Sequence, residues 1–359
     1  MKIVVSKSRS LLYLLFSLFF IILIIMSSLI KQWHLDGTIY WIASDDTVYY
    51  EALEIFTIEE FFNNWYWFVN LFLVFNVLII GDLTLYLIVV MILCLFIIKY
   101  SLKFIEPKYR LFYLLLLFIF PYANITFFSI NKEVFMFYSV VLFCCYYLSK
   151  STYILIFALL LAFCARSFLM ISLVLMLFIF PVKDKPRWIL LLFIMAVISI
   201  LPFILSELSG FSTKLIDGEI GGTAILFSSL IRDGLYIVIY PFKYIILMLS
   251  KTYQGFNIGF NFSNRPQDLH EFFVSFLSLL VFSYSLYIYL FKRKSTDTRF
   301  FYLGLFSPIL LQFSDIFHWR YSAFVYVFFV FYIISYKNGL KYFLKIRKND
   351  MNNIKNKTL

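Results

Sequence analysis

Residues 11–30 read LLYLLFSLFFIILIIMSSLI, an apolar segment of the length that crosses a lipid bilayer. A spanning helix needs about 20 mostly apolar residues. The segment follows Lys2, Lys7 and Arg9 and carries no small-residue cleavage site, so we interpret it as an uncleaved anchor. The whole chain is 63% hydrophobic with a mean hydropathy of +0.90, whereas soluble domains are about 45–50% apolar. The sequence therefore predicts an all-α integral membrane protein.

Further apolar runs alternate with polar segments along the rest of the chain. They are residues 83–98, 111–128, 134–148, 154–165, 168–180, 188–206, 272–291, 300–317 and 322–335. Two other segments, 65–80 and 234–250, are ambiguous, because each is apolar enough either to cross the membrane or to lie at its surface. We expect one polytopic domain of about ten transmembrane helices over residues 1–348, followed by a cytoplasmic tail over residues 349–359.

The distribution of Lys and Arg predicts the orientation, because basic residues concentrate in cytoplasmic loops. If neither ambiguous segment crosses, 22 of the 31 Lys and Arg residues fall on one side, together with both termini. The basic loops are residues 99–110, 183–187 and 292–299. A full crossing by residues 65–80 would move the first two loops to the other side. We therefore interpret the net charge of +11 as a cytoplasmic rim that meets anionic lipid, not as a nucleic-acid surface.

Two large loops remain on the outer side. In the first, residues 31–82, Thr57 and Glu60 have the spacing of a capping box, which predicts amphipathic helices at the outer membrane surface. A plain hairpin is the alternative for this region. The second outer loop begins at Glu207 and extends to Arg232, and the ambiguous segment 234–250 follows it.

The sequence carries no signal for a metal or cofactor. All four cysteines, Cys94, Cys144, Cys145 and Cys164, lie in apolar runs, so they predict neither a disulfide framework nor a metal site. The chain also contains no phosphate-binding Gly loop and no internal repeat. We expect no cofactor.

The charged residues left on the outer side are few, and charges retained in a membrane protein are usually functional because they are costly there. The first loop is acidic and carries two adjacent acids followed by two tyrosines. The complete set of candidates is Asp45, Asp46, Tyr49, Tyr50, Lys132, Glu133, Arg166, Arg232, Asp315, His318, Arg320 and Tyr321.

These residues suggest a reaction at a diphosphate. Arginine offers a planar, always-charged fork that suits phosphate, so Arg166, Arg320 and Arg232, with Lys132, are candidate diphosphate ligands. The candidate proton acceptors, in order of preference, are Asp46, His318 and Glu133, with Asp45 beside the first. Asp315 lies one helical turn before His318 and is placed to orient its imidazole.

Each candidate also has a structural interpretation. Asp45 or Asp46 could cap a helix, Lys132 and Glu133 could be a turn pair, and Arg232 could be a solvated loop residue. Arg166 is harder to explain structurally, because a tight turn between two helices needs no charge. The sequence shows no nucleotide-binding motif, so a sugar donor used at the outer face must already carry an activated leaving group. An isoprenoid-diphosphate-linked sugar carries one.

The layout resembles a known family. An Asp-Asp…Tyr-Tyr first outer loop, an Asn-Lys-Glu junction at 131–133, an Arg turn at 166 and a His-Trp-Arg-Tyr segment at 318–321 resemble the Wzy-type O-antigen or capsule repeat-unit polymerases, including their EpsG-like branch. The resemblance implies a glycosyltransferase of the bacterial inner membrane that joins undecaprenyl-diphosphate-linked oligosaccharides at the periplasmic face. It also implies a chain-length regulator and a flippase as partners. Such polymerases carry a large outer loop late in the chain, which residues 207–270 would supply, with 234–250 as an interfacial or re-entrant helix.

Two alternatives stay open. The doubled acid after the first span also resembles membrane glycosyltransferases of the GT-C class, whose architecture the polymerases may share. A flippase or transporter of lipid-linked sugar is the non-enzymatic alternative. Against it, the spans show almost no interior charge and few of the broken helices that transport sites use.

Overall fold

The computed structural model describes residues 83–120, 133–165, 167–182, 186–209, 230, 233, 235–257, 266–292, 297–309 and 322–340. In these ranges the elements are helices, and the only extended pairing is an isolated bridge between Ile105 and Leu340. The all-α class is therefore confirmed for this part of the chain.

Most helices follow the apolar runs of the sequence, although the helix that begins the predicted run 111–128 ends at Phe118 and the helix of the run 272–291 begins at Pro266. The helices are α5 (Leu83–Ser101), α6 (Arg110–Phe118), α8 (Glu133–Ser149), α9 (Thr152–Ala165), α10 (Ser167–Ile179), α11 (Trp188–Ser209), α13 (Tyr236–Asn257), α14 (Pro266–Phe291), α15 (Arg299–Phe306) and α16 (Ser322–Tyr336). Short 3-10 turns, η2 (Leu102–Phe104), η3 (Pro107–Tyr109) and η6 (Ser307–Ile309), connect or extend them.

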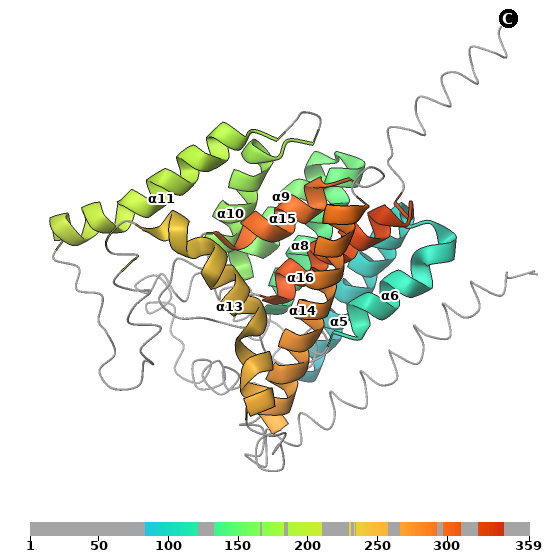
Figure 1. The fold of residues 1–359 in the computed structure, drawn as a ribbon. Helices are drawn as coiled ribbons and strands as arrows, with labels where there is room; N and C mark the ends of the chain where they lie inside the picture. Colours follow the sequence, from blue (N-terminus) through green and yellow to red (C-terminus); the bar gives the residue numbers. More distant parts are fainter. Residues whose placement is uncertain are drawn as a thin grey trace, which may run out of the picture.

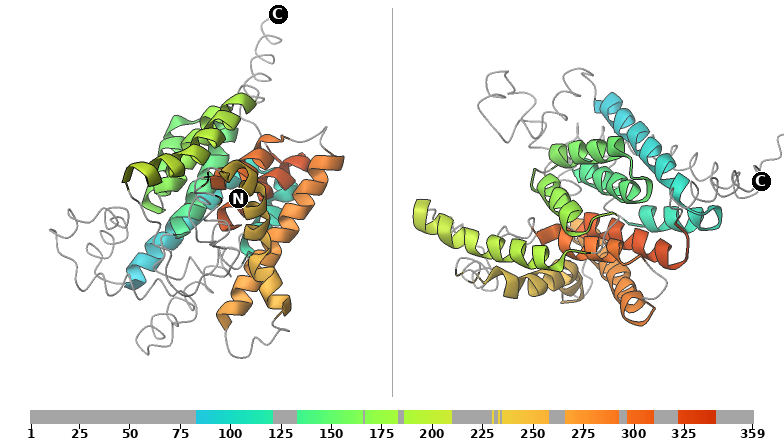
Figure 2. Two further views of the ribbon diagram at one scale, coloured as in Figure 1. Left: turned by 60° about the vertical axis from the view of Figure 1, so that its left-hand side comes forward. Right: turned by 90° about the horizontal axis from the view of Figure 1, so that it is seen from above.

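The helices form a bundle with α8 and α16 inside it (Figure 1). Helix α16 packs against α6, α8, α14 and α15, while α8 packs against α5 and α9. Figure 2 shows α5 and α6 on one flank of the bundle and α11 with α13 on another. Residues Val325–Ile334 of α16 and Val134–Cys145 of α8 are buried on every face, as expected for helices that are hydrophobic all round.

The outer helices expose large apolar side chains. Examples are Ile156 and Leu160 on α9, Phe168 and Phe178 on α10, Ile189 and Phe193 on α11, and Leu280 and Leu290 on α14. Large apolar side chains exposed on several helices are typical of a surface that meets a membrane or a partner protein. One helix of the described part, over Phe272–Phe291, is long and apolar enough to cross a membrane, and several other apolar helices are shorter.

The predicted span over residues 300–317 is described only as far as Ile309. Helix α15 ends at Phe306, and the chain continues in helical backbone through the 3-10 turn η6 at Ser307–Ile309. Pro308 lacks a backbone N–H and cannot extend the helix hydrogen-bonding pattern as other residues do. A hydropathy window does not register this end of the α-helix, because Pro308 lies among apolar residues.

The ambiguous segment 234–250 is part of a helix packed within the bundle. Helix α13 lies along α14, with the rings of Tyr244 and Phe282 5.6 Å apart. At its N-terminus, the backbone N–H of Ile237 donates to Ser199 Oγ at 3.1 Å. Because Ser199 lies in the middle of α11, α13 begins partway along its neighbour rather than at its end. Whether this segment crosses the membrane or lies at its surface stays open.

Candidate functional site

The residues proposed from the sequence fall almost entirely outside the described ranges. This holds for Asp45, Asp46, Tyr49, Tyr50, Lys132, Arg166, Arg232, Asp315, His318, Arg320 and Tyr321. Glu133 is the exception, as the first residue of α8. Whether these residues meet at one site stays a prediction.

The described part instead shows how one end of the bundle is built. The segments with basic residues gather there: the backbone N–H of Glu106 donates to Gly339 O at 2.7 Å, and Ile105 forms a bridge with Leu340. Three lysines of this end lie over tyrosine rings, Lys103 over Tyr100, Lys108 over Tyr109 and Lys337 over Tyr336. The segment after α5 and the segment after α16 therefore lie together.

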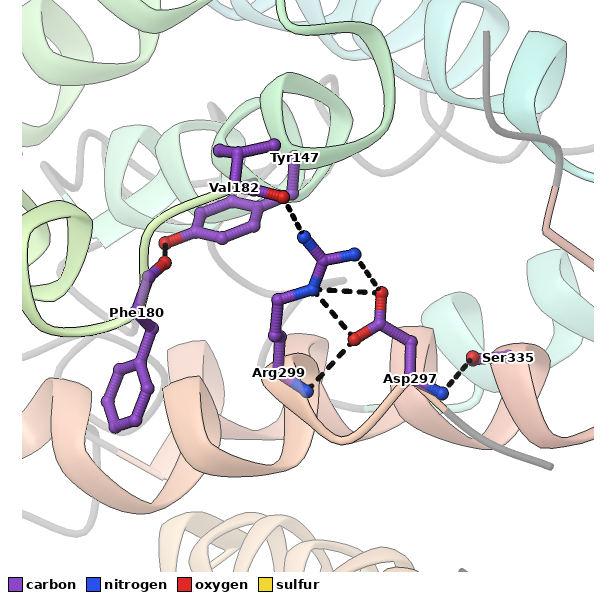
Figure 3. Close-up of polar contacts among 6 residues, drawn as sticks. All are labelled: Tyr147, Phe180, Val182, Asp297, Arg299 and Ser335. Carbon is purple, nitrogen blue, oxygen red and sulfur yellow. Dashed lines mark hydrogen bonds and ion pairs between the residues drawn. The ribbon is translucent and has the colours of Figure 1, made fainter. Parts of the chain in front are cut away.

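An Arg–Asp pair connects two further segments at this end (Figure 3). Arg299 Nε donates to Asp297 Oδ1 at 2.8 Å, and Nη2 donates to Oδ2 at 2.5 Å. The same carboxylate accepts the backbone N–H of Arg299 at 3.1 Å and so caps the start of α15, where a negative charge is stabilising. Arg299 Nη1 donates to Val182 O, which holds the α10–α11 connection against α15.

Two more hydrogen bonds complete this arrangement. The Tyr147 hydroxyl donates to Phe180 O at 2.7 Å and thereby joins the end of α8 to the end of α10. The backbone N–H of Asp297 donates to Ser335 Oγ at 3.1 Å near the end of α16. We call the set Tyr147, Phe180, Val182, Asp297, Arg299 and Ser335 the basic-end clamp.

The basic-end clamp is a structural device rather than a reaction centre. Its carboxylate already accepts hydrogen bonds from the guanidinium and from the backbone, and the two side chains are only 15% and 24% exposed. A carboxylate so occupied is a poor general base, because a base must reach a substrate proton. No group of three or more His, Cys, Asp or Glu that could hold a metal occurs in the described ranges.

The opposite end of the bundle is where Glu133 lies. Helix α8 has 17 residues, a length of about 25 Å, and its C-terminal end is in the basic-end clamp through Tyr147. Figure 1 shows α13 and α14 extending together toward the lower end of the view, away from that clamp. Glu133 is therefore separated from the basic segments by the length of the bundle.

One charged residue of the interior was missed by the sequence reasoning. Lys243 of α13 is only 1% exposed. On the same helix, the Tyr240 hydroxyl donates to Leu305 O at 2.5 Å and the Tyr244 hydroxyl donates to Gly304 O at 3.1 Å. A lysine two residues after Pro241 in an otherwise apolar run was the available signal. The expectation that the spans carry almost no interior charge did not cover this helix, because residues 234–250 were left as an ambiguous segment.

No family model matches this chain, and neither a curated protein nor a solved structure matches it.

Proposed function

We propose that the chain is a multi-pass membrane glycosyltransferase that joins undecaprenyl-diphosphate-linked oligosaccharide repeat units at the periplasmic face of the bacterial inner membrane. The observation that carries the proposal is the polarity of the bundle. The segments that follow α5, α10, α14 and α16 are tied together at one end, and Glu133 begins α8 at the other. Basic residues favour the cytoplasmic side, which leaves the outer face for the chemistry.

The exposed surface supports a membrane location. Helices α9, α10, α11 and α14 present large apolar side chains outward, while α8 and α16 are enclosed. In water, such an exterior would promote aggregation, whereas in a bilayer apolar side chains contact the lipid chains favourably. The segments at the basic end also place Lys beside Tyr, a composition suited to the interface between lipid and water.

The proposed reaction is a transfer at the anomeric carbon of the donor sugar. A hydroxyl oxygen of the acceptor repeat unit bonds to that carbon, and the bond from the carbon to the diphosphate oxygen breaks. The acceptor proton passes to Asp46, the preferred base, and the electron pair leaves with undecaprenyl diphosphate. Arg166, Arg320 and Arg232 would offset the charge that grows on the leaving diphosphate, because guanidinium groups bind phosphate through two parallel hydrogen bonds.

The test is polymerisation by the purified chain in proteoliposomes that contain an undecaprenyl-diphosphate-linked repeat unit. We expect a ladder of polymer lengths and release of undecaprenyl diphosphate. Arg166→Lys should lose most of the activity although it keeps the charge, since the fork geometry is lost. Absence of any polymer from the wild-type chain with the cognate repeat unit would reject the proposal, and full activity of Arg166→Lys would make that residue structural.

A lipid-linked-sugar flippase is the second candidate, and α13 is the observation that favours it. Lys243 is buried two residues after Pro241 in α13, and charged residues in the interior of a membrane protein often mark a transport pathway. The same proteoliposome assay distinguishes the flippase from the polymerase. A flippase moves the labelled repeat unit between leaflets without lengthening it, while a polymerase lengthens it.

A further inference from the structure

The connection between α5 and α6 is held against the segment that follows α16. The backbone N–H of Glu106 donates to Gly339 O at 2.7 Å, and Figure 1 shows the end of α16 beside this connection. Within the connection, the N–H of Tyr109 donates to Glu106 O at 2.9 Å, and Arg110 Nε donates to Ile105 O at 3.3 Å. Side chains in this region are therefore carried by a hydrogen-bonded frame rather than by an open loop.

Three exposed lysines lie on this frame, and each holds its ammonium over a tyrosine ring. The Nζ atoms of Lys103, Lys108 and Lys337 lie 5.1, 4.8 and 5.5 Å from the centroids of those rings. All three residues are within three positions of Glu106 or Gly339, whose hydrogen bond joins the two segments. Two segments far apart in the sequence thus present their cations together, and we call Lys103, Lys108 and Lys337 the lysine triad.

The charge of these two segments is strongly unbalanced. Residues 99–110 contain four Lys and Arg residues and one acid, Glu106, while residues 337–348 contain five Lys and Arg residues and no acid. Within the described ranges, the ammonium groups of the lysine triad lie over uncharged rings rather than beside a carboxylate. Clusters of four or more cations next to a membrane helix are typical of sites for anionic lipid headgroups.

The two helices that lead away from the lysine triad expose apolar side chains. On α6, Phe112 and Leu115 are exposed, as is Ile119 just after the helix, and on α5 Ile92 and Phe96 are exposed. Within each set the spacing of three or four residues places these side chains on one face. A surface with cations at one end and apolar side chains along the following turns fits a phospholipid, which has a charged headgroup and acyl chains. A free phosphate ion would contact only the cations.

We propose that the lysine triad binds the phosphate of an anionic phospholipid, whose acyl chains lie along the exposed faces of α5 and α6. This rests on the membrane location in the proposed function and not on the proposed reaction. The bound phosphate offsets the repulsion between cations from the two segments and so stabilises their contact. The site differs from a diffuse basic rim because it belongs to one flank of the bundle.

Native mass spectrometry of the full chain in a neutral detergent measures the affinity for the first bound phosphatidylglycerol molecule. Lys108→Gln and Lys337→Gln should each weaken it about fivefold, the effect expected of one cation at a membrane surface. Lys108→Arg should bind as the wild-type chain does, because it keeps the charge. Arg187→Gln is the matched control and should not weaken binding, since Arg187 is exposed just before α11, on another flank (Figure 2).

Three results would overturn the site. Equal losses in Arg187→Gln and Lys108→Gln would show a diffuse basic rim, and equal affinity for phosphatidylcholine with the same acyl chains would show that charge is not recognised. Displacement of the lipid by millimolar inorganic phosphate would show a site for the free anion instead. The lysine triad is exposed, so its variants should melt as the wild-type chain does without lipid, which separates lost binding from lost folding.

The result is separable from the proposed function. Polymer from a chain that binds phosphatidylglycerol no better than phosphatidylcholine would retain the polymerase and remove the site. Selective binding of phosphatidylglycerol that depends on the lysine triad, in a chain that makes no polymer, would retain the site and remove the polymerase.

Discussion

At the residue scale, the backbone conformation of Asn338, just after α16, directs the chain toward the segment that follows α5. Asn338 has a φ of 54°, in the left-handed region that Asn tolerates better than most side chains. Its N–H donates to Ser335 O at 2.9 Å, and the N–H of Gly339 donates to Ile334 O at 2.9 Å. These two bonds are those of a Schellman motif, and they turn the chain so that Gly339 O accepts the N–H of Glu106.

The motif predicts that substitutions at two neighbouring positions change the free energy of unfolding by different amounts. A Cβ at Gly339 would lie 2.8 Å from Ile334 Cγ2 and 2.9 Å from Tyr109 Cδ2. Gly339→Ala should therefore lower the free energy of unfolding by about 1–3 kcal/mol, the usual cost of overpacking. Asn338→Gly, whose side chain is exposed, should stay within about 1 kcal/mol of wild type, because glycine accepts the same φ. Thermal unfolding in detergent compares the two, and equal losses would contradict this packing argument.

The assignment of the base also belongs to single residues. Asp46→Asn should abolish polymer at an unchanged protein level, and His318→Ala should weaken activity less. The pH profile separates the two candidates, since a His base loses rate as pH falls through about 6.5 while an exposed Asp base remains active to about pH 4–5. Full polymer from Asp46→Asn, together with none from His318→Ala, would make His318 the base.

At the scale of the element, tyrosine hydroxyls satisfy carbonyls near helix C-termini. Tyr147 donates to Phe180 O after α10, Tyr326 to Leu116 O in the last turn of α6, and Tyr244 to Gly304 O in the last turn of α15. The last four carbonyls of a helix have no partner within it, and lipid offers no water to replace one. In the membrane setting that we propose, short helices need such donors, which gives several of the 27 tyrosines a structural role.

This predicts a loss on removing one hydroxyl. Tyr147→Phe leaves the Phe180 carbonyl without its donor and should lower the free energy of unfolding by about 1–3 kcal/mol. Tyr153→Phe on α9 is the matched control, because Tyr153 is 85% exposed, and it should have no effect. The buried thiols of Cys94, Cys144 and Cys145 report unfolding through a thiol-reactive dye. Identical melting of the two variants would show that the Tyr147 hydrogen bond contributes nothing.

The elements also show what the sequence could and could not predict. Helices α5, α8, α9, α10, α11, α14 and α16 follow apolar runs, so their positions were predictable to within a few residues. The end of α15 at Phe306 was not predictable from hydropathy, because Pro308 lies among apolar residues and a hydropathy average does not show that it lacks a backbone N–H. The burial of Lys243 was not predictable either, because the sequence does not show which helices pack around an isolated lysine in an ambiguous segment. Of the candidate site, only the place of Glu133 at the start of α8 falls in the described ranges.

At the scale of the whole molecule, the proposed function requires the two ends of the bundle to face different compartments. The basic-end clamp joins the end of α8, the α10–α11 connection, the start of α15 and the end of α16 into one layer. The chemistry that we propose is at the other end. If the basic layer faced outward, the acids and arginines proposed for catalysis would face the cytoplasm. Our proposal places polymerisation at the periplasmic face, so this orientation would be incompatible with it.

Cysteine accessibility in intact cells distinguishes the two possible orientations of the bundle. Lys108 is exposed at the basic end, and the native Cys94, Cys144 and Cys145 are buried, so only the partly exposed Cys164 needs replacement by Ser. We predict that a membrane-impermeant thiol reagent labels Asp46→Cys from the periplasm and labels Lys108→Cys only after the inner membrane is permeabilised. Labelling of Lys108→Cys in intact cells, with Asp46→Cys protected until permeabilisation, would contradict the account.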